Sequence, residues 1–172
     1  MQETTLTKAT HTDIQTLVDI GKKTFYETYA QRNSEADMTA YLKDNFNEKI
    51  ITAQLENPNS EFYIAWDDKQ PIGYLKVNEG DAQTDLKELA SLEIERIYVL
   101  ARYHGKGIGQ LLYGKAVEIA GQKHKTSIWL GVWEQNPKAI RFYEKNGFVS
   151  FARHLFIVGS EEQTDHLIRK ML

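Results

Sequence analysis

The chain has 172 residues, no cysteine, and 21 Lys and Arg against 24 Asp and Glu, for a formal net charge of −3. This length suits one domain with its own hydrophobic core and is short for two. The lack of cysteine excludes disulfides, thiolate metal sites and a cysteine nucleophile, and it fits a reducing compartment. The small negative charge gives no general attraction to nucleic acid or to an anionic membrane, so any anion site must be local.

The N-terminal segment is polar, and the longest apolar run is IWLGVW at 128–133. Neither feature resembles a secretory signal or a membrane span. We therefore expect one cytoplasmic domain over residues 1–172, without repeats or linkers.

The hydrophobic pattern alternates between helical and strand periods along the chain. Helices are expected at 13–25, 34–46, 48–56, 108–120 and 137–146, and strands at 5–8, 61–66, 72–78, 92–100, 127–133, 148–158 and 165–171. The polar turn at 67–71 predicts that the strands on either side of it form an antiparallel hairpin. In the strand at 92–100 the apolar positions change parity, which predicts a β-bulge near Glu95.

A glycine-rich turn, RYHGKGIGQLL at 102–112, joins that strand to the helix at 108–120. Glycine lets backbone N–H groups converge where a side chain would block a ligand, and a helix N-terminus favours negative charge. No acidic residue occurs between Val99 and Val117, while Arg102 and Lys106 add positive charge. The turn therefore predicts a phosphate site, the alternative being a glycine-rich turn without a ligand.

Two common phosphate motifs do not match this turn. A P-loop needs Ser or Thr after its GK pair, and neither Lys106 nor Lys115 has that setting. A dinucleotide fingerprint needs a third glycine where Gln110 stands. The turn belongs to neither class.

A short helix is predicted in NPKAIRFYEKNGF at 136–148, because Asn136 and Pro137 are a typical start and Asn146 and Gly147 a typical stop. The adjacent Phe142 and Tyr143 project about 100° apart, so one can face the core and the other a neighbouring cleft. An ordinary core tyrosine with its hydroxyl at the surface is the alternative interpretation of Tyr143.

The segment 79–95 holds six acidic residues against Lys87 alone: Glu79, Asp81, Asp85, Glu88, Glu93 and Glu95. A solvated loop is the default interpretation of 79–88. Glu93 and Glu95 share one face of a strand, where a carboxylate pair can accept a proton or bind a cation. The five histidines, His11, His104, His124, His154 and His166, show no metal-ligand spacing, so no metal site is predicted.

Taken together, these motifs resemble the GNAT-type N-acetyltransferases. HGKGIG is similar to the family's pyrophosphate loop, with His104 where Gln or Arg usually stands, and NPKAIRFYEKNGF resembles its second signature at every fixed position. TFYETYAQRNSEADMTAYL, SLEIERIYV, IWLGVWEQN and GSEEQTD resemble the bacterial PaiA-type polyamine acetyltransferases.

The resemblance implies an α/β (α+β) GNAT fold, with a mixed, mostly antiparallel sheet of about seven strands flanked by helices. It also implies acetyl-CoA as cosubstrate and no metal. The residues it assigns to the cofactor are Ile97, Tyr98, Val99, Gly105, Lys106, Gly107, Ile108, Gly109, Gln110, Asn136 and Tyr143. The backbone of 97–99 would pair with the pantetheine arm, 105–110 would cradle the pyrophosphate, and Asn136 would hydrogen-bond the arm.

In the implied reaction, a primary amine loses a proton to Glu93, acting with Glu95 and a bound water, and attacks the thioester directly. Tyr143 donates a proton to the departing CoA thiolate. The expected acceptor is a polyamine, held by carboxylates of 79–95, with no nucleic acid or membrane partner; a homodimer is compatible with this interpretation. The alternatives are an acetyltransferase for a protein N-terminus or another small amine, and a non-catalytic acyl-CoA sensor.

Overall fold

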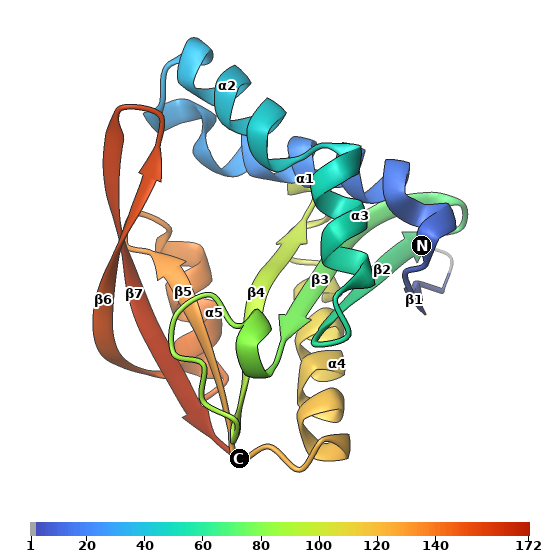
Figure 1. Cartoon of the computed structure of the whole chain (residues 1–172), viewed down its shortest axis with the longest axis vertical. Helices are drawn as coiled ribbons and strands as arrows, with labels where there is room; N and C mark the ends of the chain where they lie inside the picture. The colour runs from blue at the N-terminus through green and yellow to red at the C-terminus, as the bar shows by residue number, and fades with distance from the viewer. Residues whose placement is uncertain (1–2) are drawn as a thin grey trace.

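The computed structural model describes residues 3–172 as a seven-stranded sheet with helices on both faces (Figure 1). The strands are β1 (Thr5–Lys8), β2 (Ser60–Asp67), β3 (Gln70–Asn78), β4 (Ser91–Val99), β5 (Ser127–Trp133), β6 (Val149–Val158) and β7 (Glu161–Met171). The helices are α1 (Ile14–Tyr29), α2 (Glu35–Asn45), α3 (Glu48–Glu56), α4 (Ile108–Gln122) and α5 (Pro137–Lys145). The strand order is β1-β2-β3-β4-β5-β7-β6, and only β4 and β5 are parallel. The predicted fold class is confirmed.

Local signals set most helix ends. The side chains of Ser34, Asn47 and Asn136 accept hydrogen bonds from backbone N–H groups in the first turns of α2, α3 and α5. Each satisfies a donor that has no partner inside the helix. Helix α1 runs further than the pattern to residue 25 indicates, because Tyr29, one turn later, is also buried.

The two faces of the sheet carry separate cores. Leu75 and Val77 face α4, whereas Phe62, Ile64 and Tyr74 face α1 and α3. Neighbouring residues of a strand alternate between these cores, as the pleat requires. Each fully buried aliphatic side chain contributes about 1.5–3 kcal/mol, so both layers hold the sheet in place.

The sheet splits in its middle, between β4 and β5 (Figure 1). These strands pair only over residues 91–93 and 127–129. Beyond that point β4 stays paired with β3 as far as Val99, and β5 stays paired with β7 as far as Trp133. The facing edges of β4 and β5 therefore carry backbone groups without a strand partner.

A β-bulge lies where the split opens. Lys76 of β3 pairs with Arg96 and Val77 pairs with Ile94, so Glu95 is the extra residue of β4. The predicted bulge is confirmed. A bulge bends its strand and increases the local twist, which turns the second half of β4 away from β5.

The C-terminal hairpin of β6 and β7 completes the β5 side of the split. Strand β7 begins at Glu161, four residues before the predicted start, and this extension brings Asp165 opposite Trp133 of β5. Within residues 3–172, no helix combines the length and apolarity needed to cross a membrane.

Candidate active site

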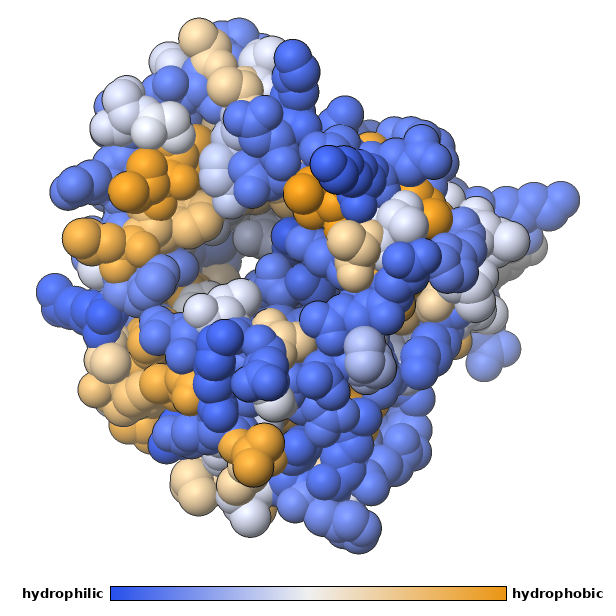
Figure 2. Space-filling view, in the orientation of Figure 1, coloured by the Kyte–Doolittle hydropathy of each residue, from blue (hydrophilic) through white to orange (hydrophobic). Residues whose placement is uncertain are grey.

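Two cavities open at the split. The first, of about 420 Å³, is the turn-side cleft; it is lined by Thr28, Ile97, Tyr98, Val99, Tyr103, His104, Gly105, Gly107, Gly109, Gln110, Asn136, Lys138, Ala139, Phe142 and Tyr143. The second, of about 270 Å³, is the acidic cavity; its polar wall includes Asp85, Glu93, Glu95, Arg96, His154 and Asp165. A passage of about 60 Å³ shares wall residues with both, among them Tyr98. Figure 2 shows a hollow at the centre of this face of the molecule.

The glycine turn has the backbone shape that an anion site needs. Gly105 and Gly107 have φ values of 76° and 82°, which glycine adopts without strain. A Cβ at either position would meet nothing within 4 Å, so both face open space. Gly107 also caps α4, whose first N–H groups lack partners inside the helix. The His104 ring bonds the Val99 carbonyl at 2.8 Å and closes the turn.

Positive charge accompanies the turn. The Lys106 ammonium lies 4.9 Å from the centre of the Tyr103 ring, and the Arg102 guanidinium lies 5.3 Å from it. Together with the helix N-terminus, these cations suit a pyrophosphate, and no carboxylate lines the cleft to oppose it.

The predicted cofactor residues fall into two groups. Those lining the turn-side cleft are Ile97, Tyr98, Val99, Gly105, Gly107, Gly109, Gln110, Asn136 and Tyr143. Ile108 is buried in the core beneath the turn, and Lys106 lies over Tyr103 rather than in the wall. Asn136 uses its side-chain oxygen to bond the Ala139 amide at 3.2 Å, which leaves its NH₂ group to face a ligand.

Tyr143 lies where the turn-side cleft meets the passage. It is only 4% exposed and packs edge-to-face against Phe142 and Phe148. Phe142 lines the cleft as well, so the pair is not divided between core and cleft. Burial, with a smaller effect of Tyr113, raises the pKa of Tyr143 above its usual value. The phenol is therefore protonated at neutral pH and can donate a proton.

Glu93 and Glu95 both lie in the wall of the acidic cavity, joined by Asn78. The Asn78 amide donates to Glu93 at 3.0 Å and to Glu95 at 2.7 Å. Glu93 also accepts from the Thr84 backbone amide at 2.9 Å and from the Thr84 hydroxyl. Burial raises the pKa of Glu93, although these hydrogen bonds oppose the rise.

Glu95 is the counter-ion of two cations. It forms an ion pair with the buried Lys76, and Arg96 lies 3.6 Å away. Burial would raise the pKa of Glu95, but Arg96 and Lys76 outweigh it and hold the pKa below its usual value. A carboxylate so strongly held as an anion is a poor proton acceptor.

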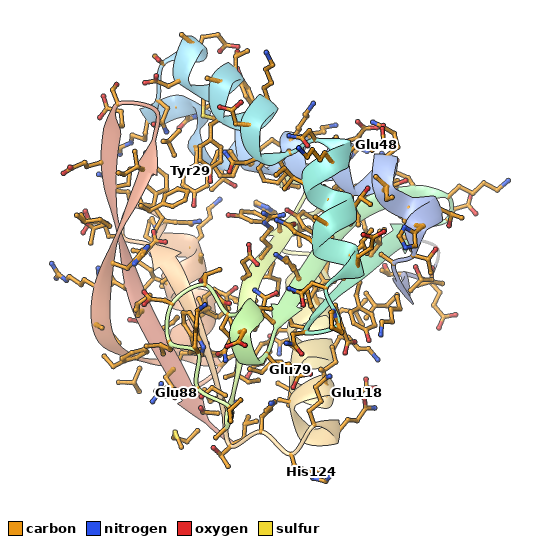
Figure 3. All side chains as sticks on the ribbon, viewed as in Figure 1. Tyr29, Glu48, Glu79, Glu88, Glu118 and His124 are labelled. Atoms are coloured by element: carbon orange, nitrogen blue, oxygen red, sulfur yellow. The ribbon has the colours of Figure 1, made fainter. Side chains whose placement is uncertain are left out.

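Two carboxylates of the loop before β4 form ion pairs with cations outside the acidic cavity. Glu79 pairs with Lys123 and Lys125, and Glu88 pairs with Arg169 at 2.8 Å. Figure 3 shows Glu79 and Glu88 in the lower half of the view, away from Tyr29, which lines the acidic cavity and lies in the upper half. Cations from other elements neutralise both glutamates and neither lines the acidic cavity, so their role in holding the acceptor stays a prediction. Asp85 of the same loop does line the cavity.

Asp165 of β7 is a cavity residue that the sequence pattern did not single out. Its Oδ1 atom is shielded from solvent and has no hydrogen-bond partner among residues 3–172. Burial raises the pKa of Asp165 to about 6, while His154 and His166 act in the opposite direction. The described residues contain no group of three or more side chains arranged to hold a metal ion.

Comparisons with known proteins agree with this geometry. Residues 18–148 match the acetyltransferase (GNAT) family. The chain is 36% identical over 160 residues to an uncharacterized N-acetyltransferase in the pepI 3′ region of Lactobacillus delbrueckii subsp. lactis, covering 93% of this chain and 92% of the relative. It is 27% identical over 141 residues to the spermidine N(1)-acetyltransferase of Thermoplasma acidophilum, covering 79% and 82%.

A solved structure extends the likeness to the whole fold. The PaiA N-acetyltransferase from Thermoplasma acidophilum, solved in complex with coenzyme A, superposes with a TM-score of 0.80 at 22% identity, covering 99% of this chain and all of that one. The family match and the 36% identical relative, together with the cleft beside the glycine turn, lead to one conclusion. The chain belongs to the GNAT family and is an acetyl-CoA-dependent N-acetyltransferase.

Proposed function

We propose that the protein transfers the acetyl group of acetyl-CoA to a primary amine of a polyamine of the spermidine or spermine kind. The observation that carries this proposal is the composition of the acidic cavity. Four carboxylates line it against one arginine and one histidine, and seven aromatic side chains complete the wall. Carboxylates and aromatic faces both attract ammonium groups, so the cavity favours a flexible cation over a neutral or anionic acceptor.

The likeness to a spermidine N(1)-acetyltransferase supports the same substrate class. A polyamine carries one amine that reacts and others that must be held. In the acidic cavity, Asp85 lies on the more exposed side, with 37% of its side chain accessible, whereas Glu93 is buried. The wall thus offers negative charge along a path from solvent to the passage.

Acetyl-CoA fits the opposite side of the split. In this proposal the backbone edge at Ile97, Tyr98 and Val99 pairs with the pantetheine arm as an added strand would, since β5 leaves that edge free. The turn at 105–110 holds the pyrophosphate through backbone N–H groups. The acyl end then lies at the passage, where Tyr143 is placed.

The chemistry needs one proton acceptor and one proton donor. A primary amine has a pKa near 10 and must lose a proton before it can attack the thioester carbon. The amine then forms the new C–N bond, the C–S bond breaks, and Tyr143 delivers a proton to sulfur. The nitrogen releases a second proton, which restores the Tyr143 phenol. No covalent acyl-enzyme is required.

Two alternatives keep parts of this scheme. A protein N-terminus or another small amine would use the same cofactor side and differ only in the acceptor. A non-catalytic acyl-CoA sensor would need the turn but not Tyr143 at the passage, and the family assignment disfavours it.

Replacing Gly107 with valine tests the pyrophosphate site. We expect Gly107→Val to abolish detectable CoA binding in calorimetry, because a branched side chain is strained at φ 82° and projects into the space facing the anion. Gly114→Val is the matched control, since Gly114 lies inside α4 with open space around it and away from the turn. Equal CoA affinity of the Gly107 variant and the control would contradict the assignment.

Replacing Tyr143 with phenylalanine tests the proton donor. Tyr143→Phe keeps the ring packing and should lower kcat by roughly 10 to 10⁴-fold, the range for one proton-transfer group, while CoA affinity stays unchanged. Tyr26→Phe, at an exposed position of α1, should leave kcat as in the wild type. A wild-type kcat for Tyr143→Phe would remove Tyr143 from the mechanism.

A panel of amines tests the substrate class. We expect kcat/KM for spermidine to exceed that for n-butylamine and for a peptide N-terminus by roughly 10-fold or more, as one or two partly exposed ion pairs would provide. The preference should shrink as salt rises, because screening weakens these pairs. Asp85→Asn should reduce the preference for spermidine, because Asp85 lines the cavity. Asp44→Asn, at an exposed position outside the cavity, should leave the preference unchanged. Preference for the peptide, or insensitivity to both salt and Asp85, would refute the polyamine assignment.

A further inference from the structure

The acidic cavity holds four carboxylates, and three of them already have partners. Glu93 accepts from Thr84 and Asn78, Glu95 pairs with Lys76, and Asp85 pairs with His154 at 3.0 Å. Each of these three groups has a partner within the protein, although the partners of Glu93 are neutral hydrogen-bond donors that leave its charge in place. Asp165 is the exception, because its Oδ1 atom is buried without a hydrogen-bond partner.

A buried, uncompensated carboxylate oxygen is costly, and native structures pair nearly all such atoms. The fold nevertheless keeps Asp165 on β7, between Trp133 of β5 and His154 of β6. An oxygen in this state suits a ligand that brings its own donors. An ammonium group brings three donors and a positive charge.

Gly131 lies next to the Asp165 carboxylate. This residue of β5 lines both the acidic cavity and the passage. A Cβ on Gly131 would lie 3.2 Å from the Oδ2 atom of Asp165, closer than ordinary van der Waals contact. The missing side chain therefore leaves room for the carboxylate in the acidic cavity, beside a residue that also lines the passage.

We propose that Asp165 binds the reacting ammonium group of the acceptor amine and accepts its proton before attack. This inference rests on the proposed function, in which a primary amine accepts the acetyl group. The ammonium transfers one proton to an Asp165 oxygen, giving a neutral amine and a carboxylic acid. The amine lone pair then forms the C–N bond as the C–S bond breaks, and the proton held by Asp165 passes to solvent at the end of the cycle.

The electrostatic environment supports this role. With its pKa raised to about 6 by burial, Asp165 is mostly ionised at neutral pH and is a better matched base than an exposed aspartate. The groups that act on it or respond to its charge are His154 on β6, His166 on β7, Tyr29 on α1 and Tyr41 on α2. Across the cavity, β4 presents Glu93, Glu95 and Arg96, and the loop before it presents Asp85.

The decisive experiment compares wild type and Asp165→Asn with the amine that the wild type acetylates best among spermidine, n-butylamine and a peptide N-terminus. We expect kcat/KM to fall by about 10² to 10⁴-fold, the contribution of one general base, with unchanged CoA affinity by calorimetry. The wild-type profile should lose activity as pH falls through about 6, where Asp165 becomes protonated. This acidic limb should disappear in Asp165→Asn and persist in His154→Gln, which keeps the carboxylate.

Stability separates this role from a structural one. Because the folded-state pKa of Asp165 lies above the ordinary value of 3.8, its ionisation destabilises the fold as pH rises through 4 to 6. Asp165→Asn should therefore melt at the same temperature as the wild type or higher at neutral pH. Gly131→Ala, which displaces the carboxylate without removing it, should also lower kcat/KM.

Unchanged kcat/KM in Asp165→Asn would overturn the proposal, as would a loss of activity accompanied by weaker CoA binding or a lower melting temperature. An acidic limb that persists in Asp165→Asn and vanishes in Glu93→Gln would assign the base to Glu93 instead. Preference of the wild type for butylamine or the peptide would refute only the polyamine substrate, since Asp165 is assessed on the preferred amine.

Discussion

The separation of β4 from β5 is the constraint on which the rest of the structure depends. The two strands share only three residue pairs, and the bulge at Glu95 turns β4 away just beyond them. Each strand keeps its other neighbour, so the sheet remains one body while a passage opens through it. Backbone groups on the facing edges lack strand partners, which makes them available to an extended ligand.

This separation also divides the charges. The turn-side cleft has no carboxylate in its wall and lies beside a helix N-terminus, whereas the acidic cavity has four carboxylates. In the proposed function, this division directs an anionic cofactor and a cationic amine to opposite openings of one passage. Tyr143 and Gly131 both line that passage, and Asp165 lies against Gly131. In this proposal, Tyr143 as proton donor, the acyl group and Asp165 as base come together at the split.

Much of this arrangement could be predicted from local sequence. The glycine turn, the caps of α2, α3 and α5, and the bulge at Glu95 depend on residues close together in the chain. Which carboxylates have a neighbouring cation could not be predicted, because Lys123, Lys125 and Arg169, which neutralise Glu79 and Glu88, lie far away in the sequence. The place of Asp165 in the cavity could not be predicted either, because it depends on the register of β7 against β5, which no local pattern specifies.

The central claim is that cofactor and amine meet through the split sheet from opposite sides. The most direct measurement is a crystal structure with a conjugate in which CoA is joined through an acetyl bridge to spermidine. The account predicts that the pantetheine arm lies along Ile97 to Val99, the pyrophosphate lies on the glycine turn, and the spermidine nitrogen at the bridge lies within hydrogen-bonding distance of Asp165. A conjugate whose spermidine arm stays on the turn side, outside the acidic cavity, would contradict it.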